Sequence, residues 1–216
     1  ALCPVLPALL ATLPAQTPIV LTGWTAASYP AVSGFPAGVW NVAASGLAVT
    51  QSQNGQPTLF FSDFLLWNQR IEGQFVVGAG DDDYVGFALG WQPGDESNAA
   101  ADYLLLDWKS GTQTFNFGAP SCTPGSTAHA GIALSRVSGI PTADEMWGHV
   151  DLNTSPCSTA GDRLTELQRG ATLGTAGWAH NQVYTVRIDY TPNRVQAWVD
   201  GVLQIGPTSF SFGHRA

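Results

Sequence analysis

Three consecutive aspartates, Asp81, Asp82 and Asp83, are the residues of this sequence best suited to chemistry. Closely spaced carboxylates repel one another unless a cation or a proton neutralises them. Carboxylate and carbonyl oxygens are the ligands that calcium prefers, usually about six to eight in total. The triplet therefore predicts a calcium site, and Asp63 and Asp107 are candidate supplementary ligands from neighbouring strand ends. A solvated acidic turn without an ion is the alternative.

The triplet leads directly into a segment, residues 84–91, in which bulky and small residues alternate. Successive side chains of a β-strand point to opposite faces of its sheet, so one face of this strand is bulky and the other nearly bare. The bulky residues are Val85, Phe87, Leu89 and Trp91, and the small set begins after Tyr84 with Gly86, Ala88 and Gly90. This pattern predicts a sandwich whose core lies on the bulky side.

Short apolar segments separated by turn residues continue along the rest of the chain, and no run has sustained helical periodicity. We expect strands near 19–25, 46–51, 58–62, 70–78, 84–91, 102–109, 113–117, 130–137, 146–151, 164–169, 182–190, 193–200 and 202–205. Asn54-Gly55 and Asp200-Gly201 are hairpin signals. The predicted fold class is all-β, a two-sheet antiparallel β-sandwich of the jelly-roll type.

One face of this sandwich is a candidate ligand surface. Alternation directs Leu104, Leu106 and Trp108 inward, and directs Tyr103 outward together with Asp107 and Lys109. The same alternation directs Arg187, Gln196 and Trp198 outward from two other strands. Aromatic rings that stack on sugars, beside polar groups that bond hydroxyls, predict a glycan-binding face. The alternative is that loops or a partner domain cover this face.

The charge of the chain excludes two classes of partner. The formal net charge is −8, with 8 Lys and Arg against 16 Asp and Glu, and Lys109 is the only lysine. Nucleic acid and anionic lipid both require dense basic residues, so neither is an expected partner. Prolines interrupt the apolar start of the chain, so no membrane span is expected there, and residues 1–20 are predicted to form a Pro-rich arm.

Two of the three cysteines, Cys122 and Cys157, bracket a polar region rich in Gly and Pro and predict a loop-closing disulfide. Such a bond contributes about 3–4 kcal/mol by the loop-entropy estimate. Two free thiols are the alternative. Cys3 remains for a partner outside this sequence, for another chain or as a free thiol. The cysteine pair and the low lysine content favour an exported protein.

The sequence lacks the constellations of known hydrolases. A Glu-x-Asp-x-x-Glu strand signature, typical of one glycosidase family of sandwich fold, is missing, as is a Gly-x-Ser-x-Gly elbow. The four histidines have no metal-ligand spacing. Asp144-Glu145 is expected to be a surface turn. We therefore predict no catalysis.

Four segments in order resemble the thrombospondin C-terminal domain: 58–64, 71–75, 81–92 and 103–109. The resemblance covers roughly residues 56–205 and implies a legume-lectin-like, concanavalin-like jelly roll that binds calcium. The region 118–162 is more elaborate than the family pattern and is expected to be an inserted loop region. The sequence also stops before the Gly-rich strand that ends the family domain, so that strand is expected to be missing or supplied from elsewhere.

These observations together predict an arm, residues 1–20, followed by one sandwich domain, residues 21–216. The expected function is an extracellular, calcium-stabilised binding or adhesion module that recognises a glycan or a protein surface. Two alternatives remain open. One is a polysaccharide-active enzyme on the same fold. The other is a self-assembling surface or filament subunit in which the arm completes the sheet of a neighbour.

Overall fold

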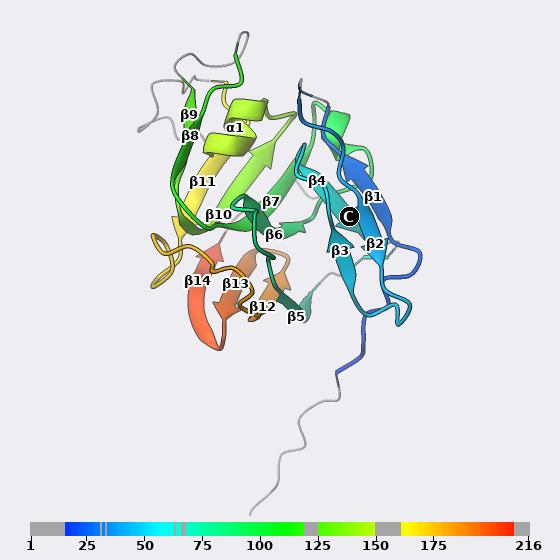
Figure 1. Ribbon diagram of the computed structural model, residues 1–216. Helices are drawn as coiled ribbons and strands as arrows, with labels where there is room; N and C mark the ends of the chain where they lie inside the picture. The colour runs from blue at the N-terminus through cyan, green and yellow to red at the C-terminus, as the bar shows by residue number, and fades with distance from the viewer. Residues whose placement is uncertain are drawn as a thin grey trace, which may run out of the picture.

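Two four-stranded antiparallel sheets face each other in this structure, a computed structural model that describes residues 16–30, 32, 34–62, 64–65, 68–118, 125–149 and 161–209 (Figure 1). Sheet I has the order β11-β10-β7-β6, made of Leu164–Arg169, Gly131–Ser138, Asp102–Lys109 and Tyr84–Leu89. Sheet II has the order β14-β13-β12-β5, made of Val202–Ser209, Arg194–Val199, Tyr184–Thr191 and Gln69–Phe75. The predicted all-β sandwich is confirmed.

The main core lies between the two sheets. Sheet I contributes Leu104, Leu106 and Trp108, so their predicted inward orientation is confirmed. Sheet II contributes alternate residues of β12, β13 and β14, namely Val186, Ile188, Tyr190, Val195, Ala197, Val199 and Ile205. Period-two alternation of apolar residues therefore accounts for this core.

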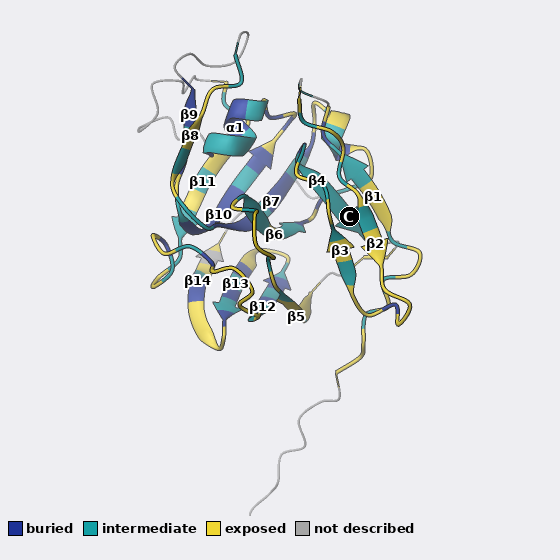
Figure 2. Cartoon of the chain, in the orientation of Figure 1, coloured by how far each residue is buried: buried dark blue, intermediate teal, exposed yellow. Residues whose placement is uncertain are grey.

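A further layer covers the outer face of sheet I. It comprises β1 (Thr25–Ser28) paired with β4 (Thr58–Phe61), and the helix α1 (Ala143–Gly148). A second apolar cluster forms beneath this layer from Trp91, Tyr103, Val137 and Leu164. The outward residues Tyr103, Asp107 and Lys109 of β7 are consequently buried, and Figure 2 shows β7 and β10 largely in dark blue. For the part of the predicted ligand face that lies on sheet I, made of Tyr103, Asp107 and Lys109, the covered alternative therefore holds.

Three smaller elements complete the architecture. A hairpin of β2 (Trp40–Val42) and β3 (Val49–Gln51) lies beside β1 and β4, and β8 (Gln113–Phe115) pairs with β9 (Ser126–Ala128) near α1. A 3-10 turn, η1, spans Asp95–Ser97. Strands β2 and β9, of three residues each, were not predicted.

Of the two predicted hairpins, one is confirmed and one is wrong. Asp200 and Gly201 have φ values of 46° and 78° and join β13 to β14. Both values are left-handed, as a type I′ turn requires. Asn54-Gly55 joins no hairpin, because β3 pairs with β2 whereas β4 pairs with β1.

The strand predicted at 146–151 is wrong, as is the surface turn predicted at Asp144-Glu145. The helix α1 begins instead after Thr142, whose hydroxyl accepts from the Glu145 amide at 3.3 Å, while the Glu145 carboxylate accepts from the Thr142 amide at 2.6 Å. This reciprocal capping box stabilises a helix start that apolar periodicity does not reveal. Asp144 and Glu145 are buried against the rest of the domain.

At Gly86, β6 lies very close to the backbone of β7. A methyl group at this position would lie 2.2 Å from the Leu106 carbonyl oxygen and 2.6 Å from the Asp107 Cα. These are backbone atoms, so the strands must separate to accept it. We expect Gly86→Ala to lower the free energy of unfolding by about 1–3 kcal/mol, measured by urea denaturation. Gly73→Ala on β5, where nothing lies within 4 Å, is the control and should change it little.

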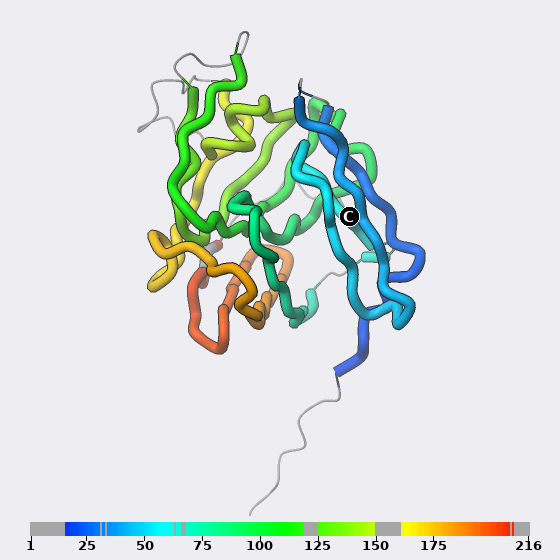
Figure 3. The backbone as a smooth tube through the Cα atoms, viewed as in Figure 1, coloured from blue at the N-terminus to red at the C-terminus, as the bar shows by residue number. Residues whose placement is uncertain are grey.

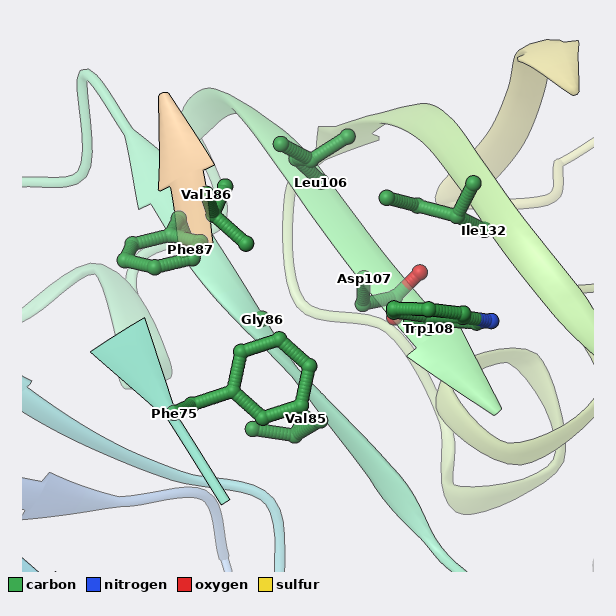
Figure 4. Close-up of a pocket in the computed structure, with 9 residues that line it drawn as sticks. All are labelled: Phe75, Val85, Gly86, Phe87, Leu106, Asp107, Trp108, Ile132 and Val186. Carbon is green, nitrogen blue, oxygen red and sulfur yellow. The ribbon is translucent and has the colours of Figure 1, made fainter. Parts of the chain in front are cut away.

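Apolar side chains line a narrow gap between the sheets near Gly86, including Phe75, Val85, Phe87 and Trp108 (Figure 4). Among the described residues that line it, Asp107 alone is ionisable, and its carboxylate is paired on the outer side of sheet I. The gap therefore offers a polar ligand no set of convergent partners. A functional site has to be sought at the surface loops and outer faces.

Candidate functional site

The loop between β5 and β6, residues 76–83, brings the three predicted carboxylates together. One carboxylate oxygen from each of Asp81, Asp82 and Asp83 lies within 4.8 Å of the others. β5 belongs to sheet II and β6 to sheet I, so this loop carries the chain across the sandwich (Figure 3). The Asp82 side chain is 53 % exposed and that of Asp83 is 33 % exposed, which leaves oxygens open to solvent.

Lys109, at the end of β7, supplies a cation to this loop. Register places it opposite Tyr84, the residue after the triplet. Its ammonium lies 3.6 Å from Asp83 Oδ1 and 3.8 Å from Asp82 Oδ2, yet the side chain is 0 % exposed. The ring of Trp147 in α1 covers it, with its centroid 4.8 Å from Nζ. The chain's only lysine is therefore a buried counter-charge for the acidic loop.

Main-chain oxygens of the loop are also bonded. Lys109 Nζ donates to the Asp82 carbonyl at 2.5 Å, and the Ser110 hydroxyl donates to the same oxygen at 2.8 Å. The His180 Nε2 atom lies 2.6 Å from the Asp81 carbonyl. These contacts fix the backbone path at Asp81 and Asp82. Of the carboxylate oxygens, Asp81 Oδ1 accepts from the Asp83 amide at 3.2 Å.

The charges of this loop suit one divalent cation. Three carboxylates and one ammonium carry a net charge of −3 + 1 = −2, which one calcium ion would neutralise. Burial raises the pKa of Asp83, and the charges of Asp81 and Asp82 raise it further, whereas Lys109 lowers it. The formal charge of −2 remains beside Lys109, and the carboxylate donor set fits a hard cation.

The two supplementary ligands predicted from sequence do not join this group. Asp63 lies outside the described residues, so its role stays a prediction. Asp107 lies under α1, where its Oδ2 is 2.9 Å from His149 Nε2, and both side chains are buried. Its prediction as a calcium ligand is wrong for this arrangement. Alternation predicted its outward orientation correctly, but the helix α1, which was not predicted, covers that face.

The Asp107–His149 pair joins α1 to sheet I. The His149 ring also stacks on Tyr84 of β6, with ring centroids 4.4 Å apart. His149 is the C-terminal cap of α1 and has a φ of 46°. Asp107 Oδ1, His149 Nδ1 and the Tyr84 hydroxyl have no hydrogen-bond partner among the described residues. Burial raises the pKa of Asp107, and His149 opposes this effect.

The predicted glycan face is only partly assembled. Arg187 and Trp198 lie side by side on the outer face of sheet II, with the guanidinium 3.7 Å from the ring centroid, and Gln196 lies two positions before Trp198 on the same strand. Tyr103 does not join them. It lies in sheet I, is 1 % exposed, and its hydroxyl is 2.5 Å from that of Tyr29 in the covering layer.

Beside Arg187, Arg70 makes a paired contact with Asp189, at 2.7 and 2.8 Å. These hydrogen bonds lower the pKa of Asp189, so its carboxylate stabilises the fold above its unfolded pKa of about 3.9. That contribution is lost as the pH falls through the lower, folded pKa. We therefore expect the stability advantage of the wild type over Asp189→Asn to disappear in acid. Urea denaturation near pH 7 and near pH 3 measures it, and an advantage that grows in acid would contradict the pairing.

Three residues of this region were not predicted to act together: Lys109, His149 and His180. The sequence carries one signal for the first, since a single lysine directly ends the strand that neighbours the acidic loop. Nothing in the sequence signals the two histidines, because their partners lie 42 and 99 positions away, at Asp107 and Asp81.

No helix in the described part of the chain is long and apolar enough to cross a membrane. Cys122 and Cys157 lie outside the described residues, and their disulfide stays a prediction.

A family model for the thrombospondin C-terminal region matches residues 36–200, which include the acidic loop, Lys109 and His149. The comparison with curated proteins gives no match to this chain.

Proposed function

The chain belongs to the thrombospondin C-terminal family, and on this premise we propose that it is a calcium-stabilised, extracellular binding module without catalytic activity. Domains of this family bind calcium and are in general extracellular. One observation carries the proposal for this chain: three carboxylates within 4.8 Å of one another retain a net charge of −2 beside Lys109.

Calcium at this loop would stabilise the sandwich at its crossing point. Asp81, Asp82 and Asp83 would hold the ion through carboxylate oxygens, while Lys109 keeps the main chain in position. Because residues 76–83 connect sheet II to sheet I, a bound ion would hold the path of the chain between the two sheets. The ion therefore acts on the stability of the fold, which is why the module needs calcium without using it for a reaction.

The outer face of sheet II is the proposed binding surface, for a glycan or a protein. Arg187, Gln196 and Trp198 present an aromatic ring and polar groups there. A glycosidase would need two free carboxylates flanking a sugar. On this face Asp189 is held by Arg70, and Glu72 accepts a bond from Gln16 at 3.3 Å, which supports a binding role over catalysis.

Thermal unfolding in calcium and in chelator tests the proposal. At a free concentration about 100 times the dissociation constant, calcium adds about 2.7 kcal/mol to the free energy of unfolding. For a domain of this size, we expect the melting temperature to rise by roughly 5–10 °C. Magnesium should replace calcium poorly, because it requires a tight octahedron.

Two matched variants locate the effect. Asp83→Asn removes one carboxylate from the acidic loop and should abolish most of the calcium-dependent rise. Asp189→Asn removes one carboxylate from sheet II, far from the loop in sequence, and should leave the rise unchanged. An equal rise in both variants would place the ion elsewhere, and no rise in the wild type would contradict the proposal.

A further inference from the structure

The outer face of sheet II differs in charge from the rest of the chain. Alternation places all five charged residues of its four strands on this face, namely Arg70, Glu72, Arg187, Asp189 and Arg194. Their charges give +3 − 2 = +1, which leaves −8 − 1 = −9 for the other residues of the chain. An acidic protein therefore carries one basic sheet face, and such a face favours a negatively charged partner.

Asp189 lies among the three arginines, but only Arg70 pairs with it. The Arg70 guanidinium donates to both carboxylate oxygens, at 2.7 and 2.8 Å, and these bonds lower the pKa of Asp189 the most. The charges of Arg187 and Arg194 lower this pKa as well, yet neither makes an ion pair among the described residues. Both arginines therefore keep their positive charge available to a ligand.

Arg187 is held in place without using its hydrogen-bond donors. Its guanidinium lies 3.7 Å from the ring centroid of Trp198, the residue opposite it on β13. Stacking occupies the flat side of the guanidinium, and the N–H groups at its edge stay free in the plane. Glu72 faces Arg187 from β5 but accepts from Gln16 instead. A planar fork of this kind matches a carboxylate, which it binds through two parallel hydrogen bonds.

The neighbouring groups on this face favour a sugar over a peptide. Strands β12 and β13 are paired on both sides, so a peptide strand cannot add to their main chains. The side chains beside Trp198 are Gln196 and Arg194, at every second position of β13. Their amide and guanidinium supply donors and an acceptor for hydroxyl groups. An acidic sugar carries a carboxylate and several hydroxyl groups on one ring, which this row of side chains can bind together.

We propose that the outer face of sheet II binds the carboxylate of an acidic sugar at the end of a glycan, and that Arg187 selects it. This inference rests on the proposed binding role of the same face and names its ligand. The carboxylate pairs with the edge of Arg187, Arg194 adds a second positive charge, and Gln196 bonds a hydroxyl group. A long polyanion is not the expected ligand, because the net charge of −9 on the other residues repels it.

NMR titration of the isotope-labelled chain in calcium tests the inference. The probes are oligosaccharides that end in glucuronic acid or in N-acetylneuraminic acid, and we expect saturable binding of at least one of them with a Kd of about 0.1–1 mM. Oligosaccharides of the same length that end in a neutral sugar should bind at least about tenfold more weakly, since they form no charge-assisted hydrogen bond. Raising the salt concentration should weaken the binding of the acidic probe.

Three variants identify the residue that selects the carboxylate. Arg187→Met keeps an apolar contact with Trp198 and should weaken binding of the acidic probe at least about tenfold. Arg187→Lys keeps the charge without the planar fork and should recover only part of the affinity. Arg136→Met removes the same charge from sheet I and should leave the affinity unchanged. Circular dichroism melts verify that the variants fold.

The possible failures of this inference differ from those of the proposed function. Equal binding of acidic and neutral oligosaccharides overturns the inference and leaves the glycan-binding role of the face intact. Undiminished acidic binding by folded Arg187→Met overturns it too, because the carboxylate then binds at another site. A wild type that binds no oligosaccharide, or only an oligo-aspartate peptide, also overturns it. The proposed role of calcium is decided separately, by the calcium-dependent rise in melting temperature.

Discussion

Replacing His149 with alanine is expected to lower the free energy of unfolding by about 3–5 kcal/mol. The substitution leaves the Asp107 carboxylate buried beneath α1 without the imidazole that lies 2.9 Å from it. It also removes the stacked contact with Tyr84. Breaking a buried pair on one side costs more than removing it whole, because an uncompensated charge stays behind. Urea denaturation at neutral pH measures the loss.

A double variant separates the charge from the shape of the site. Asp107→Asn together with His149→Ala leaves no carboxylate to desolvate, and we expect it to be more stable than His149→Ala alone. Because His149 has a φ of 46°, part of the lost free energy of unfolding in both variants comes from the backbone. Asparagine tolerates that conformation, so the difference in free energy of unfolding between His149→Asn and His149→Ala measures this part. A double variant no more stable than the single one would show that the pair carries no buried charge.

The pH dependence of this difference has a definite sign. Burial raises the pKa of Asp107, so its neutral form favours folding below the unfolded pKa of about 3.9, and that advantage is lost as the pH rises through the folded pKa. His149→Ala removes the group that holds this pKa down. The free energy of unfolding of His149→Ala lies below that of the double variant, and this difference should therefore shrink toward acid pH and grow toward neutral pH.

Replacing Lys109 with methionine is expected to make the fold strongly dependent on calcium. Methionine keeps the apolar stem beneath Trp147 and removes the charge, so the three carboxylates of the acidic loop lose their internal cation. In chelator we expect a loss of about 3 kcal/mol or more, since a buried charge interaction is broken on one side. Saturating calcium should restore part of it, so the calcium-dependent share of the stability exceeds that of the wild type.

Arg136→Met is the control for this variant. Arg136 pairs with Asp102 at 2.7 Å at the other end of β7, partly exposed and away from the acidic loop. Its loss should cost less than about 1 kcal/mol and leave the response to calcium unchanged. If Lys109→Met is no more calcium-dependent than Arg136→Met, then Lys109 is not a counter-charge for this loop.

Most of the sandwich could be predicted because its strands obey a local rule. In β7, β12 and β13 every second residue is apolar, and the structure buries that set between the sheets. The elements that escaped prediction lack such periodicity. The helix α1 is six residues long and depends on the capping box at Thr142, and β2 is an isolated segment of three residues between turn residues.

The candidate site also has a part that follows from local sequence and a part that does not. The three carboxylates are adjacent in sequence, so their proximity could be predicted from the order of the residues alone. Which face of sheet I is covered depends on β1, β4 and α1, which are remote in sequence, and so the roles of Tyr103 and Asp107 could not be foreseen. Alternation determines the direction of a side chain, but what lies in that direction depends on tertiary packing.

A calorimetric titration of the chelator-treated protein with calcium tests the central claim most directly. Wild type and Asp189→Asn are expected to give a saturable heat with one ion bound per chain, as the net charge of −2 at Asp81, Asp82, Asp83 and Lys109 predicts. Asp83→Asn should lose most of that heat. A wild type without saturable heat, and with a melting temperature that chelator leaves unmoved, would contradict calcium binding at this loop.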